Sequence, residues 1–238
     1  MKQKYNWFES AKKHGFDLDK VPEYLFTPNR WKKPRYKGKI CVDLFAGIGG
    51  ASLGFKQAGI HTPIAVDFEK WAMLTYMANL GKNPRQPVCY IHKDIRQVTG
   101  AEIVTKLEEM GYEPFIDIIW GSPPCQDFSS ANTVYKNKLP PILQTGRRYC
   151  MLEFIRLVQE LRPQCFVMEN VPGLVQGKMR PLFDEFLSRL KWAGYQVTWK
   201  ILNAADYGVP QNRHRVITIG MDAFNIVEHD PITPVLLA

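Results

Sequence analysis

The sequence predicts an α/β protein whose mostly parallel, seven-stranded sheet has helices on both faces. From residue 39 onward, short apolar runs alternate with amphipathic segments of helical spacing. Strands that alternate with helices in this way usually pair in parallel, and the connecting helices then cover the two faces of the sheet. The chain has 238 residues, which is enough for one such domain with a small appendage.

Each expected element is an apolar run or an amphipathic segment, taken here in chain order. The strands are Ile40–Leu44, Pro63–Asp67, Val88–Ile91, Phe115–Trp120, Gln164–Glu169, Gln196–Ile201 and Arg215–Ile219. The helices between them are Ala51–Ala58, Lys70–Asn79, Gly100–Met110, Met151–Leu161 and Arg180–Ala193. Large apolar residues recur at helical spacing in the last helix, as is typical of a buried face: Leu182, Phe183, Phe186, Leu187 and Leu190.

The first 38 residues differ from the rest and are expected to form a basic, aromatic-containing extension. Arg30–Lys37 is a basic cluster with interleaved aromatic side chains, and Trp7, Phe8 and Tyr24 are among the large apolar groups before it. This apolar content is too high for a disordered tail. The extension either packs over the domain with its charges in solvent or contacts phosphates. The main domain is placed at 39–222 and a C-terminal tail at 223–238.

The composition fits a globular protein with a polyanionic partner. Hydrophobic residues make up 45% of the chain and charged residues 23%, which is ordinary for soluble proteins. The formal net charge is +8, and basic proteins gain affinity for nucleic acid by neutralising phosphates. No apolar run has the length of a membrane span, and the first ten residues lack the apolar core of a signal peptide. We therefore expect a cytoplasmic location and no membrane partner.

The five cysteines predict reduced thiols and no metal site. None forms a C-x-x-C pair, and no cysteine–histidine cluster has the spacing of zinc ligands. An odd number of scattered cysteines in a chain without a signal peptide favours free thiols. Cys41 and Cys165 lie in apolar runs and are expected to fill the core.

A glycine-rich turn follows the first strand and leads into the first helix. It reads Phe45-Ala46-Gly47-Ile48-Gly49-Gly50. Glycines at such a turn let the backbone approach a ligand closely, and the N-terminus of the helix adds unpaired N–H groups. The spacing differs from the full G-x-G-x-x-G dinucleotide fingerprint, so the turn alone indicates a nucleotide site only weakly.

Acidic residues follow the next two strands. Asp67 ends the second strand about 20 residues after the glycine turn, where an acid commonly accepts hydrogen bonds from ribose hydroxyls. Its alternative role is to cap the helix that begins near Lys70. Asp94 follows the third strand, where an acid can reach the adenine edge of the same ligand. Three successive strand ends with suitable groups predict a ligand with an adenosine part.

Cys125 follows the fourth strand, in the segment Gly121-Ser122-Pro123-Pro124-Cys125-Gln126. The two prolines stiffen the backbone, and open α/β sheets bind ligands outside the carboxyl ends of their strands. A thiol held at that edge is positioned to act as a nucleophile. The alternative is a tight turn with an incidental cysteine.

A carboxylate is expected at the same edge, and two guanidinium groups follow near the end of the chain. Glu169 ends the fifth strand, and a thiol and a carboxylate brought together there indicate a nucleophile with a proton-handling acid. Alternatively, Glu169 caps its own loop. Arg213 and Arg215 lie two residues apart and share a face if the segment is extended. They either donate to a base carbonyl or to phosphates, or they serve only in ion pairs.

Together and in this order, the motifs resemble those of the cytosine-C5 DNA methyltransferases. The glycine turn is similar to the family's first motif, Asp67 lies where the second has its acid, and Asp94-Ile95 is similar to the third. The fourth, sixth and eighth motifs are matched by Pro123-Pro124-Cys125-Gln126, Glu169-Asn170-Val171 and Gln211-Asn212-Arg213-His214-Arg215. The resemblance covers residues 39–220. It implies a Rossmann-like methyltransferase fold and makes 39–222 the catalytic domain.

The resemblance implies a DNA (cytosine-5)-methyltransferase that transfers a methyl group from S-adenosylmethionine to C5 of cytosine and releases S-adenosylhomocysteine. Cys125 would attack C6 as a thiolate, because a pyrimidine C5 becomes nucleophilic only in such a covalent adduct. Glu169 would hold N3 and N4 of the base, and Arg215, with Arg213 in the same motif, would contact O2. The base must leave the DNA duplex to be reached.

The same resemblance implies a cofactor site without a metal. Phe45, Asp67 and Asp94 would cradle the S-adenosylmethionine. The further residues implied for this site are Ala46, Gly47, Ile48, Gly49, Gly50, Phe68, Ile95, Pro123 and Leu152.

The chain also departs from the family pattern. Asp67 stands where the family usually has Glu, and the loop after Cys125 lacks the usual Asp-x-Arg. Family members generally continue with a target-recognition region and two further motifs, none of which we find before Ala238. We therefore expect a split enzyme whose second polypeptide recognises the target in double-stranded DNA. The alternatives are a truncated chain and a stand-alone enzyme acting on DNA or tRNA.

Two other classes of function compete with the methyltransferase. One is a catalytically silent scaffold that binds DNA or a partner, although Cys125 and Glu169 are both chemically competent. The other is a nicotinamide-dependent oxidoreductase, against which the incomplete dinucleotide fingerprint and the Pro-Pro-Cys segment argue.

Overall fold

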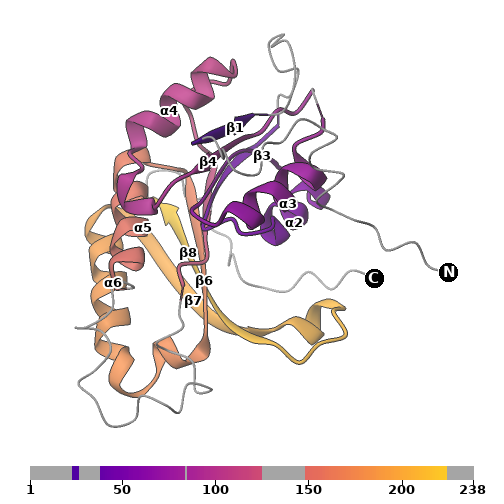
Figure 1. Ribbon diagram of the computed structural model, residues 1–238. Helices are drawn as coiled ribbons and strands as arrows, with labels where there is room; N and C mark the ends of the chain where they lie inside the picture. The colour runs from indigo at the N-terminus through magenta and orange to yellow at the C-terminus, as the bar shows by residue number, and fades with distance from the viewer. Residues whose placement is uncertain (1–22, 27–37, 84, 125–147, 224–238) are drawn as a thin grey trace, which may run out of the picture.

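The structure, a computed structural model, describes residues 23–26, 38–83, 85–124 and 148–223 (Figure 1). Within these residues eight strands form one sheet, in the order β1-β4-β3-β2-β5-β6-β8-β7. The strands are β1 (Tyr24–Phe26), β2 (Ile40–Leu44), β3 (His61–Asp67), β4 (Cys89–His92), β5 (Ile118–Gly121), β6 (Cys165–Asn170), β7 (Tyr195–Asn203) and β8 (His214–Asp222). The α-helices are α2 (Gly50–Gln57), α3 (Lys70–Leu80), α4 (Gly100–Glu109), α5 (Arg148–Leu161) and α6 (Arg180–Trp192). Short 3-10 turns are η1 (Ile95–Gln97), η4 (Pro172–Val175), η5 (Gly177–Met179) and η6 (Ala204–Tyr207).

Six of the eight strands run in one direction. β2 pairs in parallel with β3 and β5, β3 with β4, and β5 with β6. β8 lies antiparallel between β6 and β7, so β7 runs with the parallel set. The carboxyl ends of the parallel strands therefore meet at one edge of the sheet, and β8 begins at that same edge.

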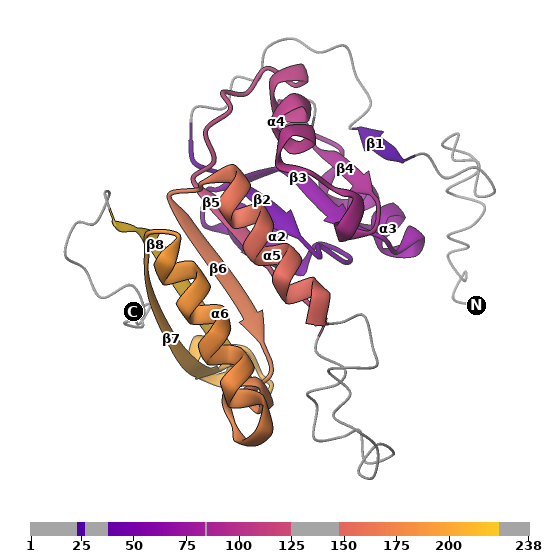
Figure 2. The same cartoon turned by 90° about the vertical axis from the view of Figure 1, so that its left-hand side faces the viewer.

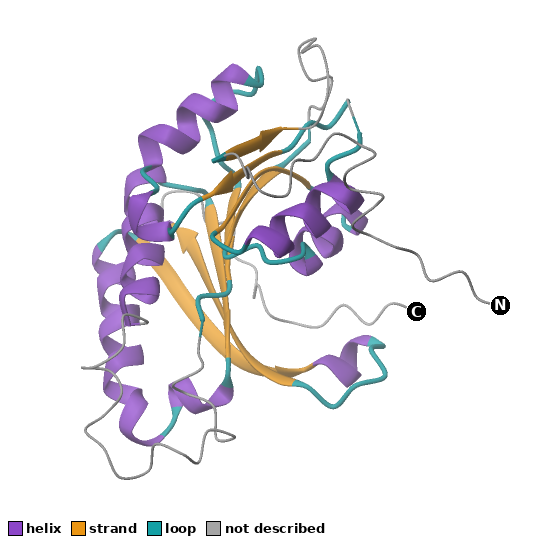
Figure 3. Cartoon of the chain, viewed as in Figure 1, coloured by secondary structure: helices purple, strands orange, loops and turns teal. Residues whose placement is uncertain are grey.

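Helices cover both faces of the sheet, as the sequence predicts (Figures 1 and 3). α4, α5 and α6 lie along one face, which Figure 2 turns toward the viewer, and α2 and α3 lie along the other. The larger core, which includes Phe154, Phe166 and Phe183, lies under the first set. A smaller core around Tyr76 and Tyr90 lies under α3. The apolar stripe of α6 is buried as expected, at Phe183, Phe186, Leu187 and Leu190.

The seven-stranded sheet expected from the sequence needs one correction, because the described residues contain an eighth strand. β1 comes from the N-terminal segment and pairs antiparallel with β4. Three residues are too few for a detectable alternation of apolar and polar side chains. Tertiary contacts stabilise the strand instead: the Tyr24 hydroxyl donates to Glu102 (2.5 Å), and Lys93 pairs with Glu102 (2.8 Å) and Glu23 (2.6 Å).

The seven expected strands are all present, with small changes at their ends. β5 begins at Ile118 and not at Phe115, whose side chain is 53% exposed. The carboxylate of Asp117 accepts a hydrogen bond from the Ile40 amide (2.9 Å), so it closes the start of β5 against β2. The division into an extension, a domain and a tail stays a prediction. Within the described residues, no helix is long and apolar enough to cross a membrane.

Candidate active site

The strand register brings the motif residues to one edge of the sheet. Leu44, Val66, Gly121 and Met168 lie in one row of paired residues across β2, β3, β5 and β6. The next residues along these strands are Phe45, Asp67, Ser122 and Glu169. Side chains from four separate sequence motifs therefore leave the sheet at the same level. The Ser122 hydroxyl also donates to the Phe45 carbonyl (3.4 Å), which links two of these strand ends.

The glycine turn between β2 and α2 has an unusual backbone. Phe45, Gly47 and Gly49 have φ angles of 61°, 51° and 93°, in the left-handed region that disfavours side chains with a Cβ. A Cβ on Gly49 would lie 2.6 Å from Leu80 Cδ1 and 2.7 Å from Tyr76 Cδ2, so space as well as dihedral angle requires glycine there. Strain of this kind in a bulky residue such as Phe45 is typical of functional sites.

Asp67 links the glycine turn to the start of α3. Its Oδ2 accepts the Gly47 amide (2.8 Å), and its Oδ1 accepts the Glu69 amide (2.9 Å). The N-cap of α3 is Glu69, whose side chain accepts from the Trp71 amide (3.4 Å). Asp67 therefore organises the loop rather than capping the helix.

A pocket lies beside Asp67 at this edge and is lined by five of the twelve residues expected in the cofactor site, Phe45, Asp67, Phe68, Asp94 and Ile95. Its lining residues are Phe45, Val66, Asp67, Phe68, Lys93, Asp94, Ile95, Arg96, Pro124 and Cys150. The wall is partly apolar and carries two carboxylates. Phe68 and Ile48 are both 65% exposed, which is unusual for large apolar side chains. Ile48 does not line this pocket.

Asp94 is engaged by a neighbouring arginine. Its Oδ1 accepts from the Arg96 amide (3.0 Å) and from Nε (2.9 Å), and its Oδ2 accepts from a terminal guanidinium nitrogen (2.5 Å). These hydrogen bonds from Arg96 lower the pKa of Asp94. The carboxylate stays charged and is oriented by Arg96, which the sequence motif did not predict.

Glu169, Arg213 and Arg215 meet at this edge as an ion-paired group. Arg215 Nε lies 2.7 Å from Glu169 Oε1, and a guanidinium nitrogen of Arg213 lies 3.5 Å from the same oxygen. The pairing of β6 with β8 brings them together, because Glu169 is opposite Ile217 in the ladder. The side chains of Glu169 and Arg215 are 20% and 25% exposed, so the group is accessible from solvent.

Cys125 lies outside the described residues, which pause after Pro124. The segment that leads to it, Ser122–Pro124, is described and lies beside the end of β6. The buried Asn170 donates from Nδ2 to the Pro123 carbonyl (3.4 Å) and accepts the Val171 amide at Oδ1 (2.9 Å). Asn170 therefore links the proline segment to the strand end that carries Glu169.

The described cysteines other than Cys150 are unreactive thiols. Burial raises the pKa of Cys41 well above its ordinary value, that of Cys89 to about 12 and that of Cys165 to about 11. They stay protonated at neutral pH, and only the thiolate is a strong nucleophile. Within the described part of the chain, no group of three or more Cys, His, Asp or Glu side chains is arranged to hold a metal ion.

Some residues predicted for the cofactor site do not line the pocket, and some lining residues were not predicted. Pro123 is buried and Leu152 packs against the larger core, whereas their neighbours Pro124 and Cys150 line the pocket. Ala46 is buried, and its amide donates to the Val66 carbonyl (2.9 Å). Sequence reasoning missed Val66, Lys93, Arg96, Pro124 and Cys150 as lining residues. Adjacency to the motifs was the available signal for four of them, but Cys150 had none.

Comparison with known proteins agrees with this fold. The C-5 cytosine-specific DNA methylase family matches residues 40–234. The chain is 39% identical over 183 residues to the Type II methyltransferase M.XorII of Xanthomonas oryzae pv. oryzae, covering 76% of this chain and 40% of that protein. It is 39% identical over 191 residues to the Type II methyltransferase M.AquIA of Picosynechococcus sp., covering 76% of this chain and 71% of that one.

Solved structures show the same arrangement. A crystal structure of an Escherichia coli prophage-encoded protein, assigned as a DNA modification methyltransferase, is 32% identical with a TM-score of 0.62. The match covers 78% of this chain and 47% of that one. DNMT2 of Spodoptera frugiperda, at 24% identity and a TM-score of 0.57 over 78% of this chain and 50% of that one, has the same fold.

The fold is thus that of the Rossmann-like methyltransferases. The chain belongs to the C-5 cytosine-specific DNA methylase family, and the match to 195 of its residues includes every motif described above. It spans less than half the length of M.XorII.

Proposed function

We propose that this chain is the catalytic part of a DNA (cytosine-5)-methyltransferase that uses S-adenosylmethionine and receives target recognition from a second polypeptide. The observation that carries the proposal is the Glu169–Arg215 pair at 2.7 Å. It lies one strand away from the proline segment that leads to Cys125. A carboxylate fixed by guanidinium groups beside a nucleophile is what chemistry on a pyrimidine ring requires.

The pocket beside Asp67 fits the adenosine part of S-adenosylmethionine. Phe45, Phe68 and Ile95 offer apolar surface for a purine, and the two carboxylates can accept hydrogen bonds from ribose hydroxyls and an exocyclic amine. Glycine at positions 47 and 49 would let the backbone of the turn approach the ligand closely. Bound there, S-adenosylmethionine would supply an electrophilic methyl group.

Glu169 and its arginines would bind the cytosine. The carboxylate can accept from N4 and from protonated N3, which lets the ring take up electron density when a nucleophile adds. Arg215 would donate to O2 of the base, and Arg213 adds positive charge at the same oxygen of Glu169. In the absence of a base, the arginines hold the Glu169 carboxylate in one orientation.

Cys125 would act as the nucleophile. Its thiolate forms a bond to C6 of cytosine, and the electron pair of the C5–C6 double bond moves toward C5, which can then attack a methyl group. Removal of the C5 proton then returns an electron pair to the ring, and the bond from sulfur to C6 breaks. Asn170 would support this step by holding the Pro123 carbonyl.

Target recognition by a second polypeptide is supported by the use to which the described residues are put. Those from 38 to 223 are taken up by one sheet and its helices, and sequence readout needs further side chains placed against base edges. M.XorII is more than twice as long as the matched region. M.AquIA, of which the chain spans 71%, is a relative of similar size.

A trapping experiment tests the chemistry. DNA of random sequence that contains 5-fluorocytosine should form a covalent adduct with the chain when S-adenosylmethionine is added, because the fluorine cannot leave as a proton does. The adduct should disappear in Cys125→Ser and persist in Cys165→Ser, the matched control, because Cys165 lies away from the pocket. The experiment is done with and without the products of neighbouring reading frames. No adduct under either condition would favour a silent scaffold.

A methylation assay tests the second polypeptide separately. The purified chain alone should methylate DNA weakly, and activity should rise when the partner is present. Strong, sequence-specific methylation by the chain alone would overturn the split arrangement and leave the proposed chemistry intact.

A further inference from the structure

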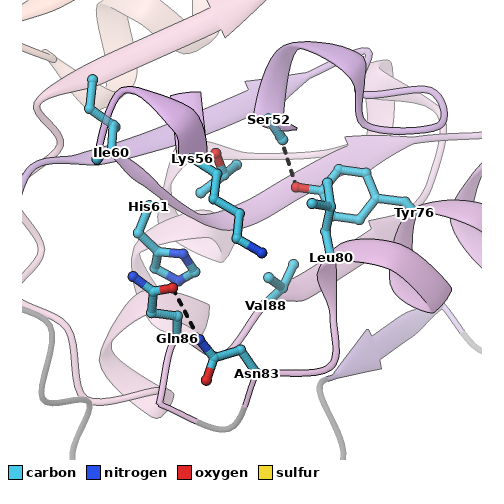
Figure 4. A pocket seen from close by; sticks show the side chains of 11 residues that line it. Ser52, Lys56, Ile60, His61, Tyr76, Leu80, Asn83, Gln86 and Val88 are labelled. Carbon is cyan, nitrogen blue, oxygen red and sulfur yellow. Dashed lines mark hydrogen bonds between the residues drawn. The ribbon is translucent and has the colours of Figure 1, made fainter. Parts of the chain in front are cut away.

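A second cavity lies between α2 and α3, near the amino-terminal ends of the parallel strands (Figure 4). Lys56 of α2 and Leu80 of α3 line its sides, and His61 and Thr62 at the start of β3 line it from the sheet. Its volume is about 260 Å³. Because the candidate active site lies at the carboxyl ends of the same strands, this cavity is separate from it.

The cavity has a positive charge and no negative one. Its lining contains Lys56 but no Asp or Glu side chain. Figure 4 shows the Lys56 amine directed toward the space between His61 and Leu80. The part of the chain that the structure describes offers Lys56 no ion-pair partner. An ammonium group aimed at a partly apolar space attracts an anion more strongly than one in open solvent, because the local dielectric constant is lower.

A buried hydroxyl favours an anion that has an oxygen atom, and the histidine beside it adds no charge. The Thr62 hydroxyl is buried, and in the described residues it has no hydrogen-bond partner, so an oxygen supplied by an occupant would satisfy it. His61 is buried, its Nε2 lies 2.9 Å from the Pro87 carbonyl, and burial lowers its pKa to about 4. The ring is therefore neutral near pH 7 and leaves Lys56 as the single full charge of the lining.

We propose that this cavity binds a small monocarboxylate with a short apolar chain. One ammonium balances one carboxylate, whereas a phosphate dianion would be left partly uncompensated. Ile60, Leu80 and Val88 provide the apolar surface for the chain. The volume is slightly below the usual range for drug-sized ligands, which favours a small occupant.

The cavity shares a wall with the glycine turn. Leu80 and Tyr76 line it, and both lie against Gly49, where an added Cβ would come within 2.7 Å of each. The Tyr76 hydroxyl also donates to Ser52 in the first turn of α2 (2.8 Å). An occupant therefore contacts side chains that support the turn without entering the candidate active site.

The test is a titration of the full 238-residue chain followed by amide NMR. Butyrate should cause saturable shifts at the amides of Ile60, His61 and Thr62. Butyramide, which has the same shape without the charge, should bind about tenfold more weakly, and butylamine should not bind. Lys56→Met should reduce butyrate affinity by about tenfold or more, and Thr62→Val should also reduce it.

The matched control is Lys82→Met, which removes an exposed lysine near the end of α3 that does not line the cavity. This variant should bind butyrate as the unchanged chain does. Circular dichroism checks that each variant is folded. Failure to see saturable shifts with butyrate, or equal butyrate affinity in Lys56→Met and the unchanged chain, would overturn the proposal.

Discussion

Asp43 is a buried carboxylic acid beneath the glycine turn. It is fully buried near the end of β2, and its Oδ2 accepts from the Ser52 hydroxyl (2.5 Å). In the described residues its Oδ1 has no hydrogen-bond partner. Burial raises the pKa of Asp43 from its ordinary 3.8 to about 7. Asp43 and Ser52 thus form a short polar connection from the sheet to the start of α2.

Stability should depend on pH through Asp43. Because its pKa is raised in the folded state, the folded chain holds a proton between about pH 4 and pH 7 that the unfolded chain has released. The free energy of unfolding therefore falls as pH rises through this window, by at most about 1.4 kcal/mol per pH unit. Asp43→Asn should remove this fall, as measured by urea unfolding. Asp206→Asn, at an exposed position, is the control and should leave the pH dependence unchanged.

His61 should change the pH dependence of stability in the opposite direction to Asp43. Burial lowers its pKa from 6.5 to about 4, so between these values the unfolded chain binds a proton that the folded chain does not. Its contribution to stability is present above about pH 6.5 and is lost as pH falls toward 4. His61→Gln should remove this loss. In Asp43→Asn the His61 effect should stand alone, and stability should rise with pH. A variant whose pH dependence matches that of the unchanged chain would contradict these assignments.

Asp67 should matter for cofactor binding through its charge. Asp67→Asn keeps the size of the side chain but weakens its acceptance of the Gly47 amide and of ribose hydroxyls. Hydrogen bonds to charged groups contribute about 1.5–3 kcal/mol, so affinity for S-adenosylhomocysteine should fall by about 10- to 100-fold. Isothermal titration calorimetry measures this. An affinity equal to that of the unchanged chain would remove Asp67 from the proposed site.

At the scale of elements, the packing of β8 beside β6 depends on the close approach of Gly220 to the ring of Phe166. A Cβ built on Gly220 would lie 1.9 Å from Phe166 Cε1, in the ring that faces α5 and Tyr195. The aromatic ring occupies the space that a side chain on β8 would fill. This packing positions β8, and with it the arginines that meet Glu169.

Gly220→Ala should destabilise the fold, because overpacking of a core costs about 1–3 kcal/mol and here the ring must move. Gly54→Ala is the matched control. Gly54 lies in α2 with no atom within 4 Å of its added Cβ, and alanine favours a helix by about 1 kcal/mol over glycine. Chemical unfolding should therefore give changes of opposite sign. Equal stability of Gly220→Ala and the unchanged chain would contradict the close approach.

At the scale of the whole molecule, the net charge of +8 predicts salt-dependent DNA binding. Each phosphate contact adds about −0.9 to the slope of log affinity against log salt concentration. Binding of random-sequence duplex DNA should therefore weaken strongly between about 50 and 200 mM salt, the range in which such contacts are lost. Fluorescence anisotropy measures the slope. A slope near zero would contradict a polyanionic partner.

Much of the candidate site could be predicted because it depends on local motifs. Glu169 was expected at this edge, since strand ends in an open parallel sheet share it. Arg213 and Arg215 stand at the start of a strand, and they reach the same edge only because β8 runs antiparallel to β6. Arg96 could not be expected at Asp94, because an ion pair two residues apart depends on the turn that η1 forms. Asn170 belonged to a motif, but its hydrogen bond to Pro123 spans 47 residues and arises only when β5 and β6 pair.

The sequence by itself determined the alternation of seven strands and five helices, the glycine turn, and the residue types at each strand end. These follow from hydrophobic periodicity and turn chemistry, which act over a few residues. Only the tertiary structure decided the antiparallel insertion of β8 between β6 and β7, the addition of β1, the contacts of Asp67 with the turn, and the cavity between α2 and α3. Each of these depends on the pairing or packing of segments far apart in the chain, and such contacts leave no local pattern in the sequence.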